Sequence, residues 1–202
     1  MTSISREVYR INPGSMKSLR ITKETLEEPG QGEVRVSVKA IGLNFADVFS
    51  VWKLYSAIPK GAFIPGLEYS GIIESVGTGT SKFKQGDRVM GICRFGAYSS
   101  HLNIDERYLV ALADTWTYSE GAAYLVQSLT AYYALLDLGG LKEGMNVLVH
   151  SAAGGVGTYA NRIAKKFGAH TIGTVGSESK VEYCKKEGYD QVIVRDNKNF
   201  GP

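Results

Sequence analysis

Cysteine is scarce in this sequence, and the scarcity excludes several classes of protein. Of the 202 residues only Cys93 and Cys184 are cysteines, and they lie far apart rather than in a C-x-x-C pair. A disulfide scaffold and a cysteine-rich zinc site are therefore not expected. No apolar run reaches the roughly 18 residues that a membrane-spanning helix needs, and residues 1–10 carry no secretory signal. We therefore expect a cytoplasmic protein with reduced thiols and no membrane association.

The chain also lacks a dense run of charge of one sign. Its 23 basic and 20 acidic residues are interspersed and give a net charge of +3. Without a basic patch, nucleic-acid binding has no support from composition. Hydrophobic residues make up 44% of the chain and charged residues 21%, which is typical of an ordinary folded protein.

The first part of the chain has the pattern of short strands separated by glycines. Residues 33–40 alternate polar and apolar side chains, residues 71–77 are bounded by glycines, and residues 86–91 form a turn followed by a strand. Several short strands at this spacing predict a barrel or a sandwich.

A different pattern begins near Ser119. Residues 119–123 and 128–138 are predicted as helices, and residues 146–150 as a fully buried parallel strand. The next segments alternate between helix and strand: 158–167, 170–175, 180–186 and 191–194. A β-α-β-α-β order is the first half of a doubly wound nucleotide-binding sheet. We predict two domains, 1–118 and 119–202, and because a complete sheet of this kind has three more strands, we expect the chain to be a fragment.

The segment from Ser151 to Gly157 connects a predicted strand to a predicted helix. In this context Gly154 would allow the backbone to approach a pyrophosphate, and Gly157 would allow close packing of the helix on the strand. Ala152 stands where the G-x-G-x-x-G pattern has its first glycine. The helix N-terminus favours an anion. We predict dinucleotide binding; the alternative is a tight turn without a ligand. The candidate contacts are Ala153, Gly154, Gly155, Val156 and Gly157.

Three segments together resemble a known family. Residues 144–165, with their Ala-Ala-Gly-Gly-x-Gly core, resemble a signature of the zinc-free quinone oxidoreductase (zeta-crystallin-like) branch of the medium-chain dehydrogenase/reductases. Residues 42–47 and 65–71 resemble two further signatures, and the resemblance extends from Val34 to about Asn199. It departs at Arg162, where the family usually has Gln, a difference expected to be structural. The resemblance implies an α/β and β protein, with a GroES-like β-barrel catalytic domain followed by a truncated Rossmann doubly wound parallel sheet.

The end of the second predicted Rossmann strand bears on the choice of cofactor. An NAD enzyme has a carboxylate there, about 20 residues after the loop, whereas this chain has Gly176 and Ser177, with Glu178 slightly later. The resemblance implies that Lys180 binds the 2′-phosphate of NADPH. It also places Arg195 beside the adenine ribose, and Thr130 in contact with the cofactor. We predict NADPH; the alternative for both cations is a solvated surface charge.

The resemblance also bears on metal binding. The catalytic zinc ligands of related alcohol dehydrogenases align with Asn44, Leu67 and Val126, none of which is a plausible zinc ligand. We therefore predict no metal site. Hydride transfer to an already electrophilic acceptor, a quinone or an α,β-unsaturated carbonyl, does not need a Lewis acid. The predicted partner is such a small molecule.

The candidate catalytic residues come from the first domain. The resemblance implies that Asn44 faces the nicotinamide and that Tyr55 lines the substrate pocket, where packing is nearly as plausible a role for Tyr55. Asp47 is expected to brace the following helix, with a basic partner as one means, and Glu68 to be structural. Three alternatives stay open: an enoyl reductase of acyl thioesters, a non-catalytic NADPH-binding protein, and a fragment inactive alone with exposed apolar surface. The full-length form is expected to be a homodimer.

Overall fold

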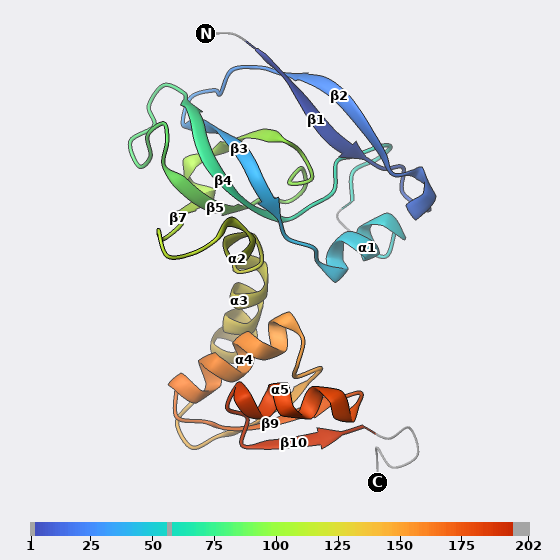
Figure 1. The fold of residues 1–202 in the computed structure, drawn as a ribbon, viewed down its shortest axis with the longest axis vertical. Coiled ribbons are helices and arrows are strands. Elements are labelled where there is room, and N and C mark those ends of the chain that lie inside the picture. Colours follow the sequence, from blue (N-terminus) through green and yellow to red (C-terminus); the bar gives the residue numbers. More distant parts are fainter. Residues whose placement is uncertain (1–2, 56–57, 196–202) are drawn as a thin grey trace. The chain divides into compact units, whose positions relative to one another are not determined.

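The computed structural model describes residues 3–55 and 58–195. The chain divides into two compact units, Met1–Val126 and Gln127–Pro202 (Figure 1). The first is rich in antiparallel strands, and the second alternates parallel strands with helices.

The first unit is built mainly of antiparallel strands. A hairpin pairs β1 (Ile4–Arg10) with β2 (Arg20–Leu26). A five-stranded sheet has the order β6-β3-β4-β5-β7. Its strands are β3 (Glu33–Ile41), β4 (Glu68–Val76), β5 (Arg88–Ile92), β6 (His101–Asp105) and β7 (Leu109–Ala111). The short 3₁₀ turns η1 (Met16–Ser18) and η2 (Glu106–Tyr108) connect strands.

Side-chain alternation on these strands produces the core of the first unit. Val34 and Val36 of β3 are fully buried and share a hydrophobic cluster with Tyr69 and Ile73 of β4. The predicted strands at 33–40 and 86–91 are confirmed, and Gly86 occupies the turn before β5 with a φ of 92° that favours glycine. The strand predicted at 71–77 begins earlier, at Glu68, because residues 68–72 pair with β5.

Two short helices complete the first unit. Helix α1 (Phe45–Val51) follows β3, and helix α2 (Tyr118–Ala122) begins with a capping box between Thr117 and Glu120. Gly121 and Ala122 of α2 are buried, and α2 packs on β3, β4 and β5. The predicted boundary after residue 118 therefore precedes the division at residue 126, since the sheet retains α2.

The second unit is a three-stranded parallel sheet with helices. Helix α3 (Leu125–Tyr132) starts in the first unit and continues as the π-helical segment η3 (Tyr133–Leu138). The sheet order is β10-β9-β8. The remaining elements are β8 (Asn146–His150), α4 (Gly155–Lys166), β9 (His170–Val175), η4 (Glu178–Lys180), α5 (Val181–Lys186) and β10 (Gln191–Val194). The predicted β-α-β-α-β order is confirmed, with α4 starting at Gly155 rather than at residue 158.

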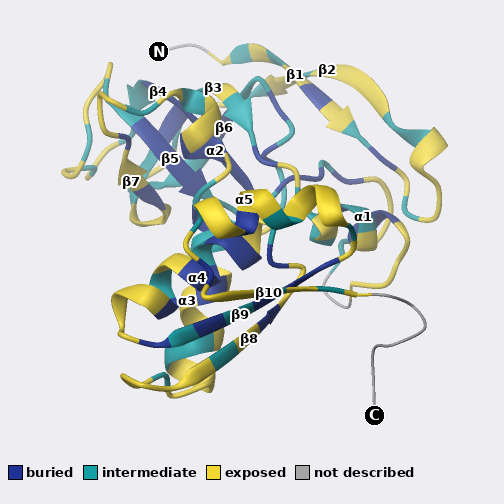
Figure 2. Ribbon diagram, turned by 60° about the horizontal axis from the view of Figure 1, so that its bottom comes forward, coloured by how far each residue is buried: buried dark blue, intermediate teal, exposed yellow. Residues whose placement is uncertain are grey.

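The prediction that β8 is fully buried is wrong. Val149 packs in a cluster with Ala160 of α4 and Cys184 of α5. Leu148 alternates to the opposite face and is 54% exposed, and Ile193 of β10 is 44% exposed. The helices α4 and α5 pack on this sheet and show their outer faces to solvent (Figure 2). The apolar run at residues 146–150 therefore forms a strand with one face packed against helices and the other exposed.

Candidate functional site

The glycine loop follows β8 and ends at the start of α4. Ser151 has a φ of 54°, in the left-handed region, which turns the chain away from the strand. The next residue, Ala152, is buried, and its N–H donates to the carbonyl oxygen of Thr174 on β9 at 3.0 Å. The N–H of Gly154 donates to Ser151 O at 2.8 Å, and α4 then begins at Gly155. The loop is thus tied to both neighbouring strands.

Gly157 leaves no room for a side chain, whereas at Gly155 a Cβ would meet the end of the flexible Gln127 side chain. A Cβ on Gly157 would lie 2.6 Å from Ser151 O and 2.7 Å from Ala152 O. A Cβ on Gly155 would lie 2.2 Å from Oε1 of Gln127. The backbone of residues 154–156 lies at the start of a 12-residue helix, where Gly155 and Val156 are exposed. First-turn N–H groups lack intrahelical partners and favour an anion, so this loop fits a diphosphate. Ala153 belongs to the same turn.

The ends of β9 and β10 lie on the same edge of the parallel sheet as the loop. Gly176 follows β9 with open space around its Cα, and the Ser177 and Ser179 hydroxyls lie 2.9 Å apart. Lys180 is exposed at the end of η4. The N–H of Arg195 donates to Val175 O at 2.8 Å, which places Arg195 beside the end of β9.

This edge is where doubly wound sheets bind their ligands. The structure therefore brings the predicted residues Gly176, Ser177, Lys180 and Arg195 to the edge that carries the loop. Glu178 is exposed in the same segment. Thr130 lies on α3 and is exposed.

Arg162, the departure from the family pattern, lies on the exposed side of α4. Its guanidinium binds Glu187 through Nε at 2.8 Å and Nη2 at 3.0 Å. The same group lies 5.7 Å from the centroid of the Tyr159 ring. The substitution thus serves contacts within the α4–α5 layer, in agreement with the structural role expected for it.

In the first unit, Asp47 braces the start of α1 through neutral donors. Its carboxylate accepts from the N–H of Asn44 at 2.9 Å and from the N–H of Gly66 at 3.2 Å. The hydroxyl of Tyr98 donates to it at 3.0 Å. The expected bracing role is confirmed. A basic partner is not among these three donors, because the backbone and a phenol supply them.

Glu68 is the second buried acid, and it holds Asn44. Glu68 opens β4 and is fully buried. Its Oε1 accepts from Nδ2 of Asn44 at 3.0 Å, and its Oε2 accepts from the N–H of Val126, in the first turn of α3, at 2.9 Å. The two carboxylate oxygens therefore connect the loop before α1 to the start of α3.

Burial shifts the protonation of both acids in the same direction. Desolvation raises the pKa of Asp47, opposed by its donors Asn44, Tyr98 and Gly66. Desolvation likewise raises the pKa of Glu68, opposed by hydrogen bonds from Val126 and Asn44, while the nearby Asp47 charge raises it further. Burial also raises the pKa of the Cys93 thiol to about 12, so this cysteine is not an activated nucleophile.

A mainly apolar pocket of about 280 Å³ lies beside Asn44. Asn44, Asp47 and Tyr98 are the lining residues with polar side chains. The other lining residues are Ile11, Met16, Leu19, Leu43, Val48, Val51 and Pro65. Tyr55 is not among the described residues that line this pocket; it follows α1 and is 41% exposed. The structure therefore places Asn44 at a pocket and leaves Tyr55 on the surface.

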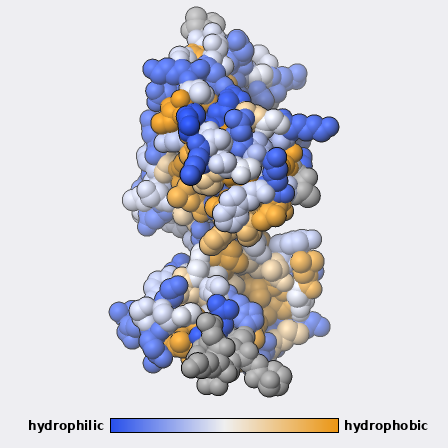
Figure 3. All heavy atoms as spheres, turned by 90° about the vertical axis from the view of Figure 1, so that its right-hand side faces the viewer, coloured by the Kyte–Doolittle hydropathy of each residue, from blue (hydrophilic) through white to orange (hydrophobic). Residues whose placement is uncertain are grey.

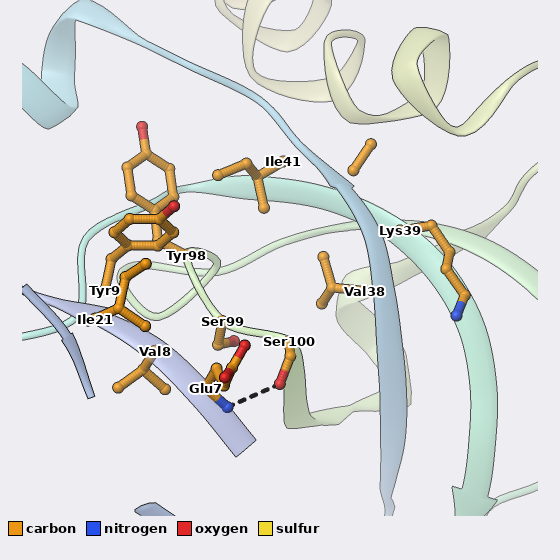
Figure 4. Close-up of a pocket in the computed structure, with 11 residues that line it drawn as sticks. Glu7, Val8, Tyr9, Ile21, Val38, Lys39, Ile41, Tyr98, Ser99 and Ser100 are labelled. Atoms are coloured by element: carbon orange, nitrogen blue, oxygen red, sulfur yellow. Dashed lines mark hydrogen bonds between the residues drawn. The ribbon is translucent and has the colours of Figure 1, made fainter. Parts of the chain in front are cut away.

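Tyr98 also lines a second pocket of about 280 Å³, between β1, β2 and β3 (Figure 4). Tyr9 and Tyr98 meet edge to face there, with ring centroids 6.4 Å apart. The N–H of Glu7 donates to Ser100 Oγ at 2.9 Å, so the loop at 98–100 is bound to β1. No buried charged side chain points into this pocket among its described lining residues.

Within residues 3–55 and 58–195, no group of three or more His, Cys, Asp or Glu side chains has the arrangement of a metal site. Of the positions that align with zinc ligands, Asn44 binds Glu68 and Val126 binds Glu68 through its backbone. No helix in this described part is long and apolar enough to cross a membrane.

The sequence did not predict two side-chain contacts, one in each unit. Tyr98 reaches Asp47 across 51 residues, and Gln127 fills the space above Gly155. Neither residue belongs to a motif, and in each case folding brings the side chain against a residue that is distant in the sequence. The close approach at Gly155 could have indicated that some side chain packs there, but not which one.

Comparisons with known proteins agree with this geometry. Residues 30–194 match the family of the alcohol dehydrogenase GroES-like domain. A rat protein named synaptic vesicle membrane protein VAT-1 homolog is 39% identical over 165 residues, which are 82% of this chain and 41% of that protein.

Two solved structures are similar over nearly the whole chain. Escherichia coli quinone oxidoreductase complexed with NADPH has a TM-score of 0.84 and 36% identity, covering 94% of this chain and 58% of that one. The CurK enoyl reductase has a TM-score of 0.86 and 30% identity, covering 94% and 59%. The chain thus spans about 40 to 60% of the length of these relatives.

Proposed function

Because the chain belongs to the zinc-free quinone oxidoreductase branch of the medium-chain dehydrogenase/reductases, with a GroES-like domain and a Rossmann-type sheet, we propose that it is an NADPH-dependent reductase. Its acceptor is a quinone or an activated alkene. The observation that carries this proposal is the shared sheet edge, where the loop 151–157 and the group Ser177, Lys180 and Arg195 follow neighbouring strands.

Different residues at this edge bind different parts of the cofactor. Backbone N–H groups of Gly155, Val156 and Gly157 face the diphosphate at the start of α4. The Ser177 hydroxyl and the Lys180 ammonium bind the 2′-phosphate, and Arg195 adds positive charge or stacks on the adenine. Gly176 leaves the space that the ribose needs. Thr130 provides a further contact from α3.

The first unit supplies the candidate residues for the reaction. The resemblance implies that Asn44 contacts the nicotinamide; its side chain is held by Glu68 and its backbone by the Asp47 brace. When bound, the reduced nicotinamide supplies the hydride, and the protein supplies orientation. The apolar pocket beside Asn44 accepts an uncharged ring or alkyl group, since apolar cavities of about 150 Å³ already hold benzene and this pocket is larger. Tyr55 remains a candidate donor to the developing oxygen, and solvent is an alternative proton source.

The test is a fluorescence titration of the purified protein with NADPH and, separately, with NADH. We expect NADPH to bind more tightly by about tenfold or more, which is the contribution of one charge-assisted contact. Lys180→Ala should remove most of this preference while leaving NADH affinity nearly unchanged.

Lys186→Ala is the matched control, because Lys186 is an exposed lysine on α5 that pairs with Glu182 at 3.6 Å. It should leave both affinities as they are. Equal or tighter binding of NADH would overturn the cofactor assignment. A loss of NADPH preference in both lysine variants would show that net charge, rather than a phosphate pocket, is responsible.

The similarity to the CurK enoyl reductase favours a second candidate, reduction of enoyl thioesters. Steady-state NADPH oxidation distinguishes the two. Turnover with an enoyl-CoA but little with 1,4-naphthoquinone would select the thioester reaction, and the reverse result the quinone reaction. NADPH binding without oxidation by either acceptor would select a non-catalytic binding protein.

A further inference from the structure

We propose that the buried hydroxyl of Tyr189 positions the first turn of α4, the turn that carries the proposed diphosphate site. Tyr189 acts through the carbonyl oxygen of Gly157 rather than by contact with the cofactor, so it is a positioning residue. The inference rests on the proposed function for its ligand. It concerns the second unit alone, because Tyr189 and α4 both belong to that unit.

The first turn of α4 is built from residues that give a helix start little stability of its own. Its N-cap residue is Gly154, which has no side chain to accept from the free N–H groups. Gly155 and Gly157 lie in the turn itself, and a glycine in a helix loses more backbone freedom on folding than any other residue. The same features suit an anion, since a capping side chain would occupy the N–H groups that bind it. Such a turn needs support from elsewhere in the fold.

Tyr189 supplies this support. Its hydroxyl donates to the carbonyl oxygen of Gly157 at 2.8 Å, and both residues are buried. The carbonyl groups of a helix point toward its C-terminal end, so this hydrogen bond reaches the turn from the side opposite to the free N–H groups. Burial raises the pKa of Tyr189, which keeps the phenol protonated and therefore a donor. The bond holds the turn while leaving its N–H groups to a ligand.

The Tyr189 side chain is itself held at both ends. Gly188 turns the chain out of α5 with a φ of 88°, and the N–H of Tyr189 donates to Cys184 O at 3.2 Å. On β9, a Cβ on Gly173 would lie 3.0 Å from Cδ1 of the Tyr189 ring, so the glycine at this strand position makes room for the ring. A side chain fixed at its backbone and at its ring places its hydroxyl at one point, as a positioning residue must.

A second tyrosine supports the same turn from α5. The Thr158 hydroxyl donates to Gly154 O at 3.0 Å, so the Tyr183 hydroxyl, 3.1 Å from Thr158 Oγ1, is the donor in that pair. The N–H of Thr158 also donates to Gly154 O, at 2.9 Å. Because Tyr183 is 43% exposed, its hydroxyl can be removed without disturbing the core.

The test removes each hydroxyl and keeps the ring. Wild type, Tyr189→Phe and Tyr183→Phe are compared by NMR hydrogen exchange of the Thr158 N–H without ligand, and by fluorescence titration with NADPH and with NADH. We expect Tyr189→Phe to speed this exchange about three- to tenfold and to weaken the binding of both nucleotides by a similar factor, the contribution of one hydrogen bond. The ratio of the two affinities should stay the same, because both nucleotides carry the diphosphate. Tyr183→Phe should act in the same direction and by less.

Thr171→Val is the matched control in the same unit. It removes a buried hydroxyl that donates to Asp190 Oδ2 at 3.2 Å, at the amino-terminal end of β9 and so at the edge of the sheet opposite to the loop. Thr171→Val and Tyr189→Phe should each lower the unfolding temperature by about 2–4 °C. Only Tyr189→Phe should change the Thr158 exchange and the nucleotide affinities.

Two results would overturn the inference. One is a Tyr189→Phe variant that unfolds at a lower temperature but keeps the wild-type exchange at Thr158 and the wild-type affinities, since the hydroxyl would then only stabilise the unit. The other is a loss of affinity for NADPH alone, which would place the effect at the 2′-phosphate. If the wild type binds neither nucleotide, the proposed function fails, and the exchange at Thr158 alone decides whether Tyr189 holds the turn.

Discussion

At the scale of single residues, Gly157 is the position where the loop depends most directly on the absence of a side chain. The Cβ of Gly157→Ala would overlap two backbone carbonyl oxygens, at 2.6 and 2.7 Å, and backbone cannot move aside as a flexible side chain can. We expect a loss of about 1–3 kcal/mol in the free energy of unfolding and a marked loss of NADPH affinity. Urea denaturation and the fluorescence titration measure the two effects.

Gly176→Ala is the control for this prediction, because a Cβ there meets no atom within 4 Å and the φ of Gly176 does not require glycine. Gly176→Ala should change the free energy of unfolding by no more than about 0.5 kcal/mol. Equal destabilisation by both alanines would mean that backbone flexibility, and not the close approach, explains the glycine at 157.

Residue roles can be predicted from the sequence only where a motif specifies the local geometry. The loop 151–157 carries its own signal, since the strand before it and the helix after it are visible in the periodicity. The contacts of Asp47 and Glu68 are different. Their partners Tyr98 and Val126 lie 51 and 58 residues away, and only the folded sheet brings them close.

At the scale of elements, Asp190 ties α4 to β9 just before β10. It accepts from Lys165 Nζ at 2.7 Å and from the N–H of Thr171 at 2.6 Å. The hydrogen bond from Lys165 and that from Thr171 lower the pKa of Asp190 to about 2. Because the folded pKa lies below the unfolded value of about 3.9, the stabilisation is present above about pH 4 and is lost as the pH falls toward 2.

Asp190→Asn should therefore be less stable than the wild type at pH 7, and the difference should shrink as the pH falls from about 4 to 2. Unfolding temperatures measured across this range give the comparison. Asp114→Asn is the control, since the Asp114 side chain is fully exposed and its ion pair is with Arg88, at 3.7 Å. A difference between wild type and Asp190→Asn that persists to about pH 2 would mean that the aspartate acts by packing rather than by charge.

The order and type of the elements in the second unit were predictable because each has a strong period and several end at a glycine, as Gly168 and Gly188 show with φ values of 73° and 88°. The extent to which each strand is buried could not be predicted. Val147 and Val149 lie on one face of β8, and Leu148 lies on the other between Asn146 and His150; the sequence of one strand does not reveal which face a helix covers. The division between the units likewise lies later than predicted, because α2 packs on the β sheet of the first unit.

At the scale of the whole molecule, both units expose large hydrophobic side chains, and Figure 3 shows such residues on their surfaces. In the first unit they gather on and beside α1, where Phe45 is 80% and Trp52 is 52% exposed. In the second unit, Leu148 and Ile193 occupy the sheet face away from Val149, and both belong to strands at the two edges of the sheet. Exposed apolar surface of this kind promotes association.

The two faces of β8 should consequently respond in opposite ways to a polar substitution. The pair Leu148→Thr and Ile193→Thr should change the free energy of unfolding by no more than about 0.5 kcal/mol per site, and it should lower self-association measured by light scattering. Val149→Thr, one residue along the same strand, introduces a hydroxyl into the buried cluster with Ala160 and Cys184 and should cost about 1–3 kcal/mol. If Leu148→Thr proves as destabilising as Val149→Thr, the face that carries Leu148 is packed in solution, and the strand is buried on both sides as its apolar sequence first indicated.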